Sequence, residues 1–142
     1  MHLRLYPTSL LEGSEIVNEE IKRRWIAKLE SGGYAQTANK LADDSGYCCL
    51  GVLCEVAVED GVVFKTIPGD GERFWYTSKL DSGDSEGAVL PEAVVKWAGL
   101  KDTNPDVSYI DADGVEDNAT LAELNDNGHT FLEIAQLVEQ SL

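Results

Sequence analysis

Two stretches of the chain combine residue types that could bind a ligand. In the first, Tyr34, Gln36 and Tyr47 lead into an apolar run that starts with adjacent cysteines, C-C-L-G-V-L-C at 48–54. If this run is a helix, its first backbone N–H groups have no partner inside the helix, and such groups bind phosphate without arginine. The tyrosines and the glutamine could stack on a ligand or form hydrogen bonds with it.

The second stretch is the pair Asn125-Asp126, close to the end of the sequence. An amide beside a carboxylate can form hydrogen bonds with a base edge or with ribose hydroxyls. Both stretches also have a purely structural interpretation, because Asn and Asp commonly cap helices and form turns. The residue types alone leave the two interpretations open.

Catalytic motifs are missing from the sequence, which has neither a glycine-rich phosphate loop nor a nucleophile elbow. The cysteine spacing, C-C-x4-C at 48–54, does not match a zinc site, and we expect these cysteines to be packing residues. His129 precedes a predicted helix and is expected to be an exposed loop residue rather than a catalytic base. We therefore expect no catalytic residue, no metal and no cofactor.

The net charge is the strongest signal in the composition. The 142 residues include 26 acidic and 11 basic side chains, for a net charge of −15, and residues 61–142 carry 16 of the acids with only 5 bases. A nucleic acid would be repelled, because affinity for it depends on neutralising phosphates. The acidic excess favours high solubility, with an acidic surface for a basic partner and a high-salt host as alternatives.

Length and hydropathy predict one globular domain. The chain has the ordinary size of a domain, with 43% hydrophobic and 26% charged residues. No apolar run approaches the roughly 20 residues that a membrane-spanning helix needs. The start of the chain has a single arginine and an apolar stretch broken by Pro7, which makes it a poor signal peptide. We expect a cytoplasmic protein that does not bind membranes.

Two helices are predicted in the first half of the chain. The first covers 18–30, with Asn18 as its N-cap. Its apolar stripe consists of Ile21, Trp25 and Leu29. The second is a buried helix at about 48–58, in which Gly51 costs roughly 1 kcal/mol relative to alanine. This cost indicates that another element or a ligand approaches the helix backbone closely. Residues 34–41 are ambiguous between a loop and a short helix.

The second half combines hairpins and helices. Hairpins are predicted around the turns at 68–71 and 113–114, and the polar stretch 81–87 is expected to be irregular. Helices are predicted from Pro91 to Gly99, at 120–124, and from the capping box at Thr130 to residue 142. These elements predict an α+β fold, with helices packed against a small antiparallel sheet and with Trp25 and Trp97 in the core. The domain is expected to cover 18–142, after an N-terminal extension at 1–17.

Five sequence blocks follow one another along the chain: R-R-W-I-A-K-L-E-S-G-G-Y-A-Q (23–36), C-C-L-G-V-L-C (48–54), L-P near 90, W-A-G-L (97–100) and L-N-D-N-G-H-T-F-L-E-I-A (124–135). In this order they resemble a widespread family of small, mostly uncharacterised bacteriophage proteins. The resemblance covers about residues 18–142 and implies a protein that acts in the cytoplasm of an infected bacterium. It implies no particular reaction.

The phage context implies counter-defence as the function. The resemblance suggests a non-catalytic protein that sequesters a nucleotide-derived immune signal, such as a cyclic oligonucleotide or an ADP-ribose derivative. Tyr34 or Trp75 would stack on a base, and Arg24 would neutralise a phosphate. The predicted ligand-binding residues are Arg24, Tyr34, Gln36, Tyr47, Cys48, Cys49, Trp75, Asn125 and Asp126.

Two alternatives stay open. An acidic protein of this kind could bind and inhibit a basic host protein as a nucleic-acid mimic, or a phosphodiesterase could degrade the signal. Sequestration is favoured because the blocks that carry the resemblance are apolar and amide-rich rather than acidic. It predicts that Asn125→Ala abolishes ligand binding and leaves the melting temperature nearly unchanged, and it is compatible with a homo-oligomer whose pockets lie between subunits.

Overall fold

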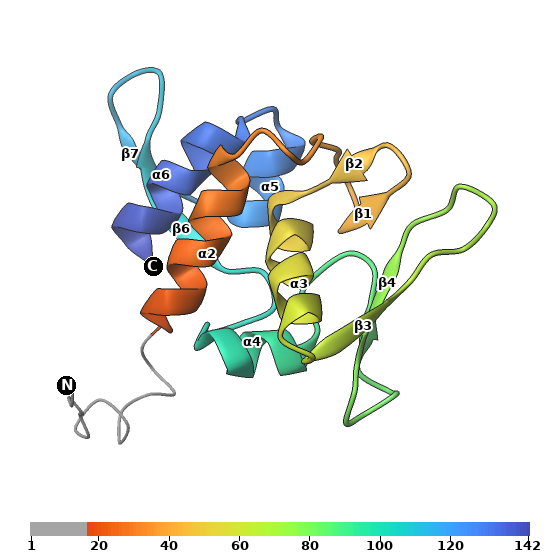
Figure 1. The fold of residues 1–142 in the computed structure, drawn as a ribbon. Helices are drawn as coiled ribbons and strands as arrows, with labels where there is room; N and C mark the ends of the chain where they lie inside the picture. The colour runs from red at the N-terminus through yellow and green to blue at the C-terminus, as the bar shows by residue number, and fades with distance from the viewer. Residues whose placement is uncertain (1–16) are drawn as a thin grey trace, which may run out of the picture.

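The computed structural model describes residues 17–142, which form five helices and three small antiparallel sheets (Figure 1). The helices are α2 (Glu19–Glu30), α3 (Cys49–Glu59), α4 (Glu92–Ala98), α5 (Leu121–Asp126) and α6 (Phe131–Ser141). The strands are β1 (Ala42–Asp43), β2 (Gly46–Tyr47), β3 (Val63–Thr66), β4 (Trp75–Ser78), β5 (Ser85–Glu86), β6 (Asp106–Ile110) and β7 (Glu116–Thr120). The α+β prediction is therefore confirmed. Of the predicted extension at 1–17, only Val17 falls within the described residues.

Local capping signals predicted the starts of α2 and α6. The Asn18 side chain accepts hydrogen bonds from the backbone N–H groups of Glu20 and Ile21, both at 3.1 Å. At the start of α6, the predicted capping box is present: Thr130 Oγ1 accepts from Glu133 N, and Glu133 Oε1 accepts from Thr130 N. Both helices turn one apolar stripe inward, and they pack against each other.

Helix α3 is the centre of the core. It lies between α2 on one side and the β3–β4 hairpin on the other, and α5 packs beside it (Figure 1). From Cys49 to Cys54 every residue of α3 is buried. Trp25 of α2, which is 1% exposed, donates its indole N–H to the Cys49 carbonyl at 2.9 Å. Trp97 is only partly buried against this core, so its predicted core position holds in part.

Three segments differ from the sequence-based expectations, and a fourth, left open between a loop and a short helix, is a loop. Residues 34–41 contain no helix, and Gln36 instead forms an isolated parallel bridge with Tyr47. The stretch 81–87, expected to be irregular, contains β5, whose Ser85 hydroxyl lies 2.7 Å from the Thr77 hydroxyl of β4. Strands β6 and β7 extend the predicted short hairpin to five residue pairs. Pro91 is the N-cap of α4 rather than its first residue, and Asp84 accepts the first N–H groups of that helix.

The helices of residues 17–142 are all too short or too polar to cross a membrane.

Candidate functional site

The first turn of α3 is where most of the predicted ligand-binding residues meet. A short hairpin, β1–β2, lies across this turn and is tied to it by a hydrogen bond of 2.9 Å from Cys48 N to the Leu41 carbonyl. The preceding strand-like segment is joined to the hairpin by bonds of 2.8 Å, from Tyr47 N to Ala35 O and from Thr37 N to Tyr47 O. The start of α3 is therefore covered by protein, and both Cys48 and Cys49 are buried.

Gly51 explains how the hairpin can lie so close to α3. A Cβ atom at this position would fall far inside van der Waals contact with the carbonyl oxygen of Leu41. The glycine that the sequence marks as costly is thus required by another protein segment. Of the two explanations that the sequence left open, the structure shows a neighbouring element.

The Asn125 side chain closes the N-terminus of α3. It comes from α5, is 3% exposed, and its Oδ1 accepts from Cys49 N at 3.2 Å and from Gln36 Nε2 at 2.9 Å. Its Nδ2 donates to Thr37 O at 2.7 Å and to Asp126 Oδ1 at 3.3 Å. All the donors and acceptors of the amide are therefore occupied within the protein. Asn125 supplies the cap that the Cys48 side chain does not form.

Gln36 and Asp126 form further bonds at this place, where residues 34–41, the start of α3 and the end of α5 meet and which we call the junction. Gln36 Nε2 also donates to His129 O at 2.8 Å, and Asp126 Oδ1 accepts from Asn39 N at 2.9 Å. Asn39 has a φ of 70°, a left-handed conformation that asparagine tolerates better than most residues. The three polar side chains that were expected to contact a ligand thus join residues 36–39 to the end of α5 and the loop after it.

Tyr34 and Tyr47 form an aromatic pair at the edge of this junction. Their ring centroids lie 5.1 Å apart at an interplanar angle of 83°, and both residues are half-buried. Lys28 Nζ lies 5.6 Å from the Tyr34 centroid, and Lys65 Nζ lies 5.7 Å from the Tyr47 centroid. The sequence did not predict these two lysine contacts, because Lys28 belongs to α2 and Lys65 to β3, and only the packing of these elements beside α3 brings them to the tyrosines.

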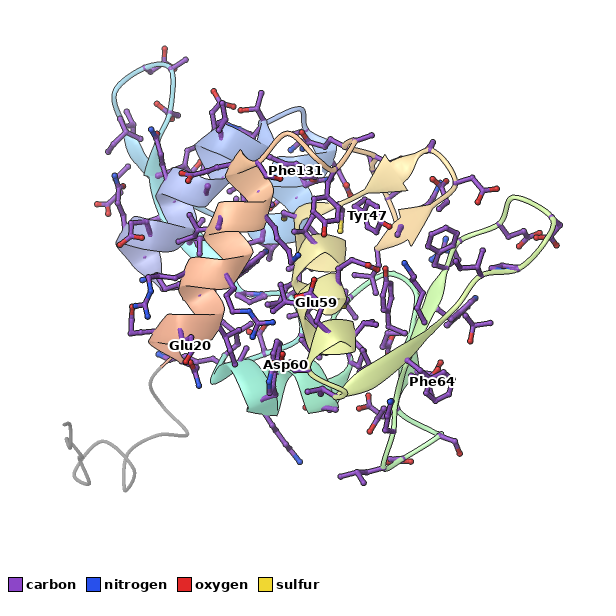
Figure 2. The ribbon with its side chains drawn as sticks, in the orientation of Figure 1. Glu20, Tyr47, Glu59, Asp60, Phe64 and Phe131 are labelled. Atoms are coloured by element: carbon purple, nitrogen blue, oxygen red, sulfur yellow. The ribbon has the colours of Figure 1, made fainter. Side chains whose placement is uncertain are left out.

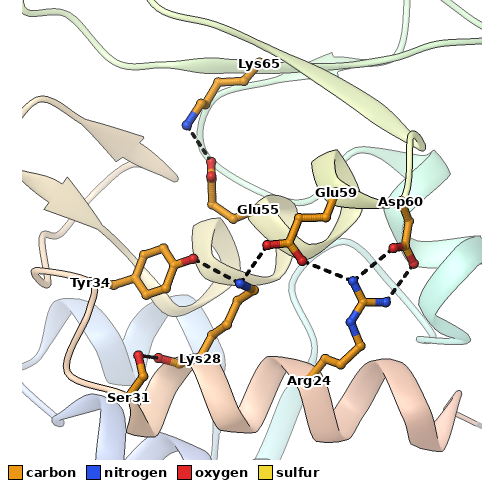
Figure 3. A network of polar contacts seen from close by, with 8 residues as sticks. All are labelled: Arg24, Lys28, Ser31, Tyr34, Glu55, Glu59, Asp60 and Lys65. Carbon is orange, nitrogen blue, oxygen red and sulfur yellow. Dashed lines mark hydrogen bonds and ion pairs between the residues drawn. The ribbon is translucent and has the colours of Figure 1, made fainter.

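Arg24 lies at the opposite end of α3. Its guanidinium binds Asp60 through two bonds of 2.9 Å and Glu59 through one of 3.1 Å (Figure 3). Lys28 donates to the other oxygen of Glu59 at 2.8 Å. The bond from Arg24 lowers the pKa of Asp60, and the bonds from Lys28 and Arg24 lower that of Glu59. Because α3 has 11 residues, about 16 Å separates its two ends, and Lys28 links this cluster to the junction through a bond of 3.3 Å to the Tyr34 hydroxyl.

Trp75 lies on the outer side of the β3–β4 hairpin, where it is 42% exposed. Phe64 of β3 is on the same side and points away from the body of the molecule (Figure 2). The structure thus brings together seven of the nine predicted residues and leaves Arg24 and Trp75 outside the junction.

The thiols at the junction are not ionised at neutral pH. Burial raises the pKa of Cys48 to about 11 and raises that of Cys49 well above its ordinary value. Neither cysteine is therefore a nucleophile in this state, since the thiolate is the reactive form. Within residues 17–142 no group of three His, Cys, Asp or Glu side chains is placed to hold a metal ion.

Surface cavities formed by residues 17–142 away from the junction include three of similar size. One of about 420 Å³ lies between the loop after α4 and the end of α6, and one of about 520 Å³ lies between α4 and the loop after β4. The third, also about 420 Å³, lies between β6 and the end of α6. None of the nine predicted residues lines these three cavities.

Comparison with known proteins identifies the family. Residues 17–142 match the model of a family described as a domain of unknown function, DUF8296, and the chain belongs to that family. The match covers the whole described part of the chain, in agreement with a single domain. No curated protein and no solved structure gives a significant match.

Proposed function

We propose that this member of the family is a non-catalytic phage protein that binds a basic host protein through its acidic surface. The observation that carries the proposal is the composition of residues 102–126, where eight carboxylates occur without a lysine or an arginine. Seven of these eight acidic residues are exposed. Such a surface attracts a basic partner over a distance and accelerates its association.

Much of this charge lies on a hairpin that projects from the body of the molecule. The β6–β7 arm, residues 106–120, extends beyond the helices at the upper left of Figure 1. It carries five acidic side chains and no basic one. Three basic side chains lie instead around α3, where Arg24, Lys28 and Lys65 pair with carboxylates of α3 and its C-cap. Among the described residues, no ion pair involves a carboxylate of the arm.

Partner binding should weaken steeply as salt is added. With the full chain as bait in a host lysate and the captured protein then purified, we expect its dissociation constant to rise about tenfold or more between 50 and 500 mM salt, because exposed charges are screened. The triple variant Asp113→Asn, Glu116→Gln, Asp117→Asn should bind more weakly and lose part of the salt dependence.

The matched control removes three acids from other turns: Asp44→Asn, Asp70→Asn, Glu72→Gln. Both triple variants have the same net charge, so a weaker complex for the arm variant alone assigns the effect to the arm. Binding that is insensitive to salt, or equal losses in both variants, would contradict the proposal.

Sequestration of a nucleotide-derived signal is the second candidate. It is favoured by the aromatic pair Tyr34–Tyr47, whose ring centroids lie 5.6 and 5.7 Å from the ammonium groups of Lys28 and Lys65. Both ammonium groups also pair with carboxylates of α3, which a ligand phosphate would have to replace. Aromatic rings and lysines together suit a phosphorylated base. The amide and carboxylate of the junction support it less, because their polar atoms are already used by the protein.

A thermal scan with cyclic oligonucleotides and ADP-ribose isomers tests this second candidate. A true ligand at 100 times its dissociation constant should stabilise the protein by about 2.7 kcal/mol. A ligand recovered intact would establish sequestration, and a ligand recovered cleaved would make the protein a phosphodiesterase. No shift with any compound would exclude these classes of ligand.

A further inference from the structure

One face of the β6–β7 arm has no covering element among the described residues. Val107 is buried and Tyr109 is half-buried on the face that packs toward the helices. On the opposite face, the alternation of the strands places Ser108 and Ile110 beside Glu116 of the partner strand, and all three are exposed. Two aliphatic side chains of the arm are exposed, Ile110 at 65% and Val115 of the turn at 58%.

A cavity of about 420 Å³ lies between this arm and the last turns of α6. Its apolar lining comes from Tyr109, Ile110 and Leu137, and its polar lining includes Glu116, Gln140 and Ser141. The cavity therefore offers an aromatic ring, two aliphatic side chains and one carboxylate at the same place.

The electrostatic environment of the cavity favours a cation. No lysine or arginine lines it, and within residues 17–142 none lies within ion-pair distance of Glu116. Gln140 and Ser141 belong to the C-terminal turn of α6, where the helix dipole adds negative potential; the Lys22 ammonium, bonded to Glu139 O at 3.1 Å, offsets part of it. The neighbouring carboxylates of the arm act in the same direction.

We propose that this cavity receives an arginine side chain of the basic partner, an inference that rests on the function proposed above. The guanidinium pairs with the Glu116 carboxylate, and its aliphatic stem packs on Ile110, which lies on the same face of the arm. Tyr109 and Leu137 line the cavity on the side of the helices. A second copy of this chain is a poor occupant, because it carries the same net charge of −15. Arginine is also among the residues that most often dominate protein–protein interfaces.

The test uses the full chain, labelled with ¹⁵N, and N-acetyl-arginine amide as the probe. Amide shifts should concentrate at residues 108–110, 116 and 137–141, and the neutral isostere N-acetyl-citrulline amide should cause none. Glu116→Gln should raise the dissociation constant of the arginine probe about tenfold, because one charge-assisted pair is lost. Glu72→Gln, an exposed acid of the β3–β4 turn, is the matched control and should leave the affinity unchanged.

Three results would overturn the inference: no shift, shifts spread evenly over the acidic surface, or equal binding of the citrulline probe. With the purified partner, Ile110→Ser should weaken binding and Trp75→Ser, another exposed apolar residue, should not. If the partner binds in a salt-dependent way and Ile110→Ser and Glu116→Gln leave its affinity unchanged, the arginine site is refuted and the proposed function is kept. If the arginine probe binds in the cavity but no basic partner is found, the proposed function is refuted and the arginine site is kept.

Discussion

Replacing Asn125 with alanine should lower the melting temperature by about 10 °C. The change removes a buried amide and leaves Cys49 N–H and the Thr37 carbonyl without their partner. Buried groups left unpaired cost about 1–3 kcal/mol each, so we expect a loss of about 3 kcal/mol in a chain of this size. This reverses the expectation from the sequence that the variant would keep its melting temperature. Differential scanning calorimetry measures the effect.

Asn127→Ala is the matched control, because Asn127 is exposed and two residues away; its melting temperature should change little. Asn125→Asp gives a second measurement. Burial, the Thr37 carbonyl and Asp126 disfavour a charged carboxyl there, whereas the Cys49 and Gln36 N–H donors favour it. We expect the first three to prevail and to raise its pKa in the folded state above about 3.9, the ordinary value. A raised pKa means that the stability of this variant relative to the wild type is highest below about pH 4 and falls as the pH rises. An unchanged melting temperature for Asn125→Ala would restore a ligand role for Asn125.

The parts of the fold that the sequence predicted depend on neighbours along the chain. Asn18 caps a helix two and three residues away, and Thr130 pairs with Glu133. Strand β5 escaped prediction because two residues are too few to show an alternating pattern. It exists because Ser85 and Glu86 find a partner strand in β4, which local signals do not reveal.

For the junction at α3, the sequence predicted which residue types take part but not which partners they contact, because those contacts join distant parts of the chain. Residue types correctly indicated polar side chains around the start of this helix, but Gln36 and Asn125 are 89 residues apart in sequence. Whether Asn125 faces a ligand or Cys49 depends on how α5 packs, and no local pattern encodes that. The Lys28–Tyr34 and Lys65–Tyr47 contacts went unseen because the two lysines come from α2 and β3, on either side of α3.

Gly51→Ala tests the same junction from the helix side. In an exposed helix this change is favourable by about 1 kcal/mol, because alanine is the better helix former. Here the added methyl group would overlap the Leu41 carbonyl oxygen, which cannot retreat easily since it accepts from Cys48 N and since Leu41 N is bonded to Gly87 O. We expect a net loss of several kcal/mol, either a melting temperature lower by more than about 10 °C or a failure to fold.

Gly69→Ala separates this overlap from the general effect of adding a methyl group. A Cβ atom added at Gly69 would meet no other atom within 4 Å, so this substitution should change stability by no more than about 0.5 kcal/mol. Urea denaturation followed by circular dichroism compares the two variants. If Gly51→Ala is as stable as the wild type, the β1–β2 hairpin moves away from α3 at little cost. The start of α3 would then be accessible, and its backbone N–H groups would regain the anion-binding role that the sequence suggested.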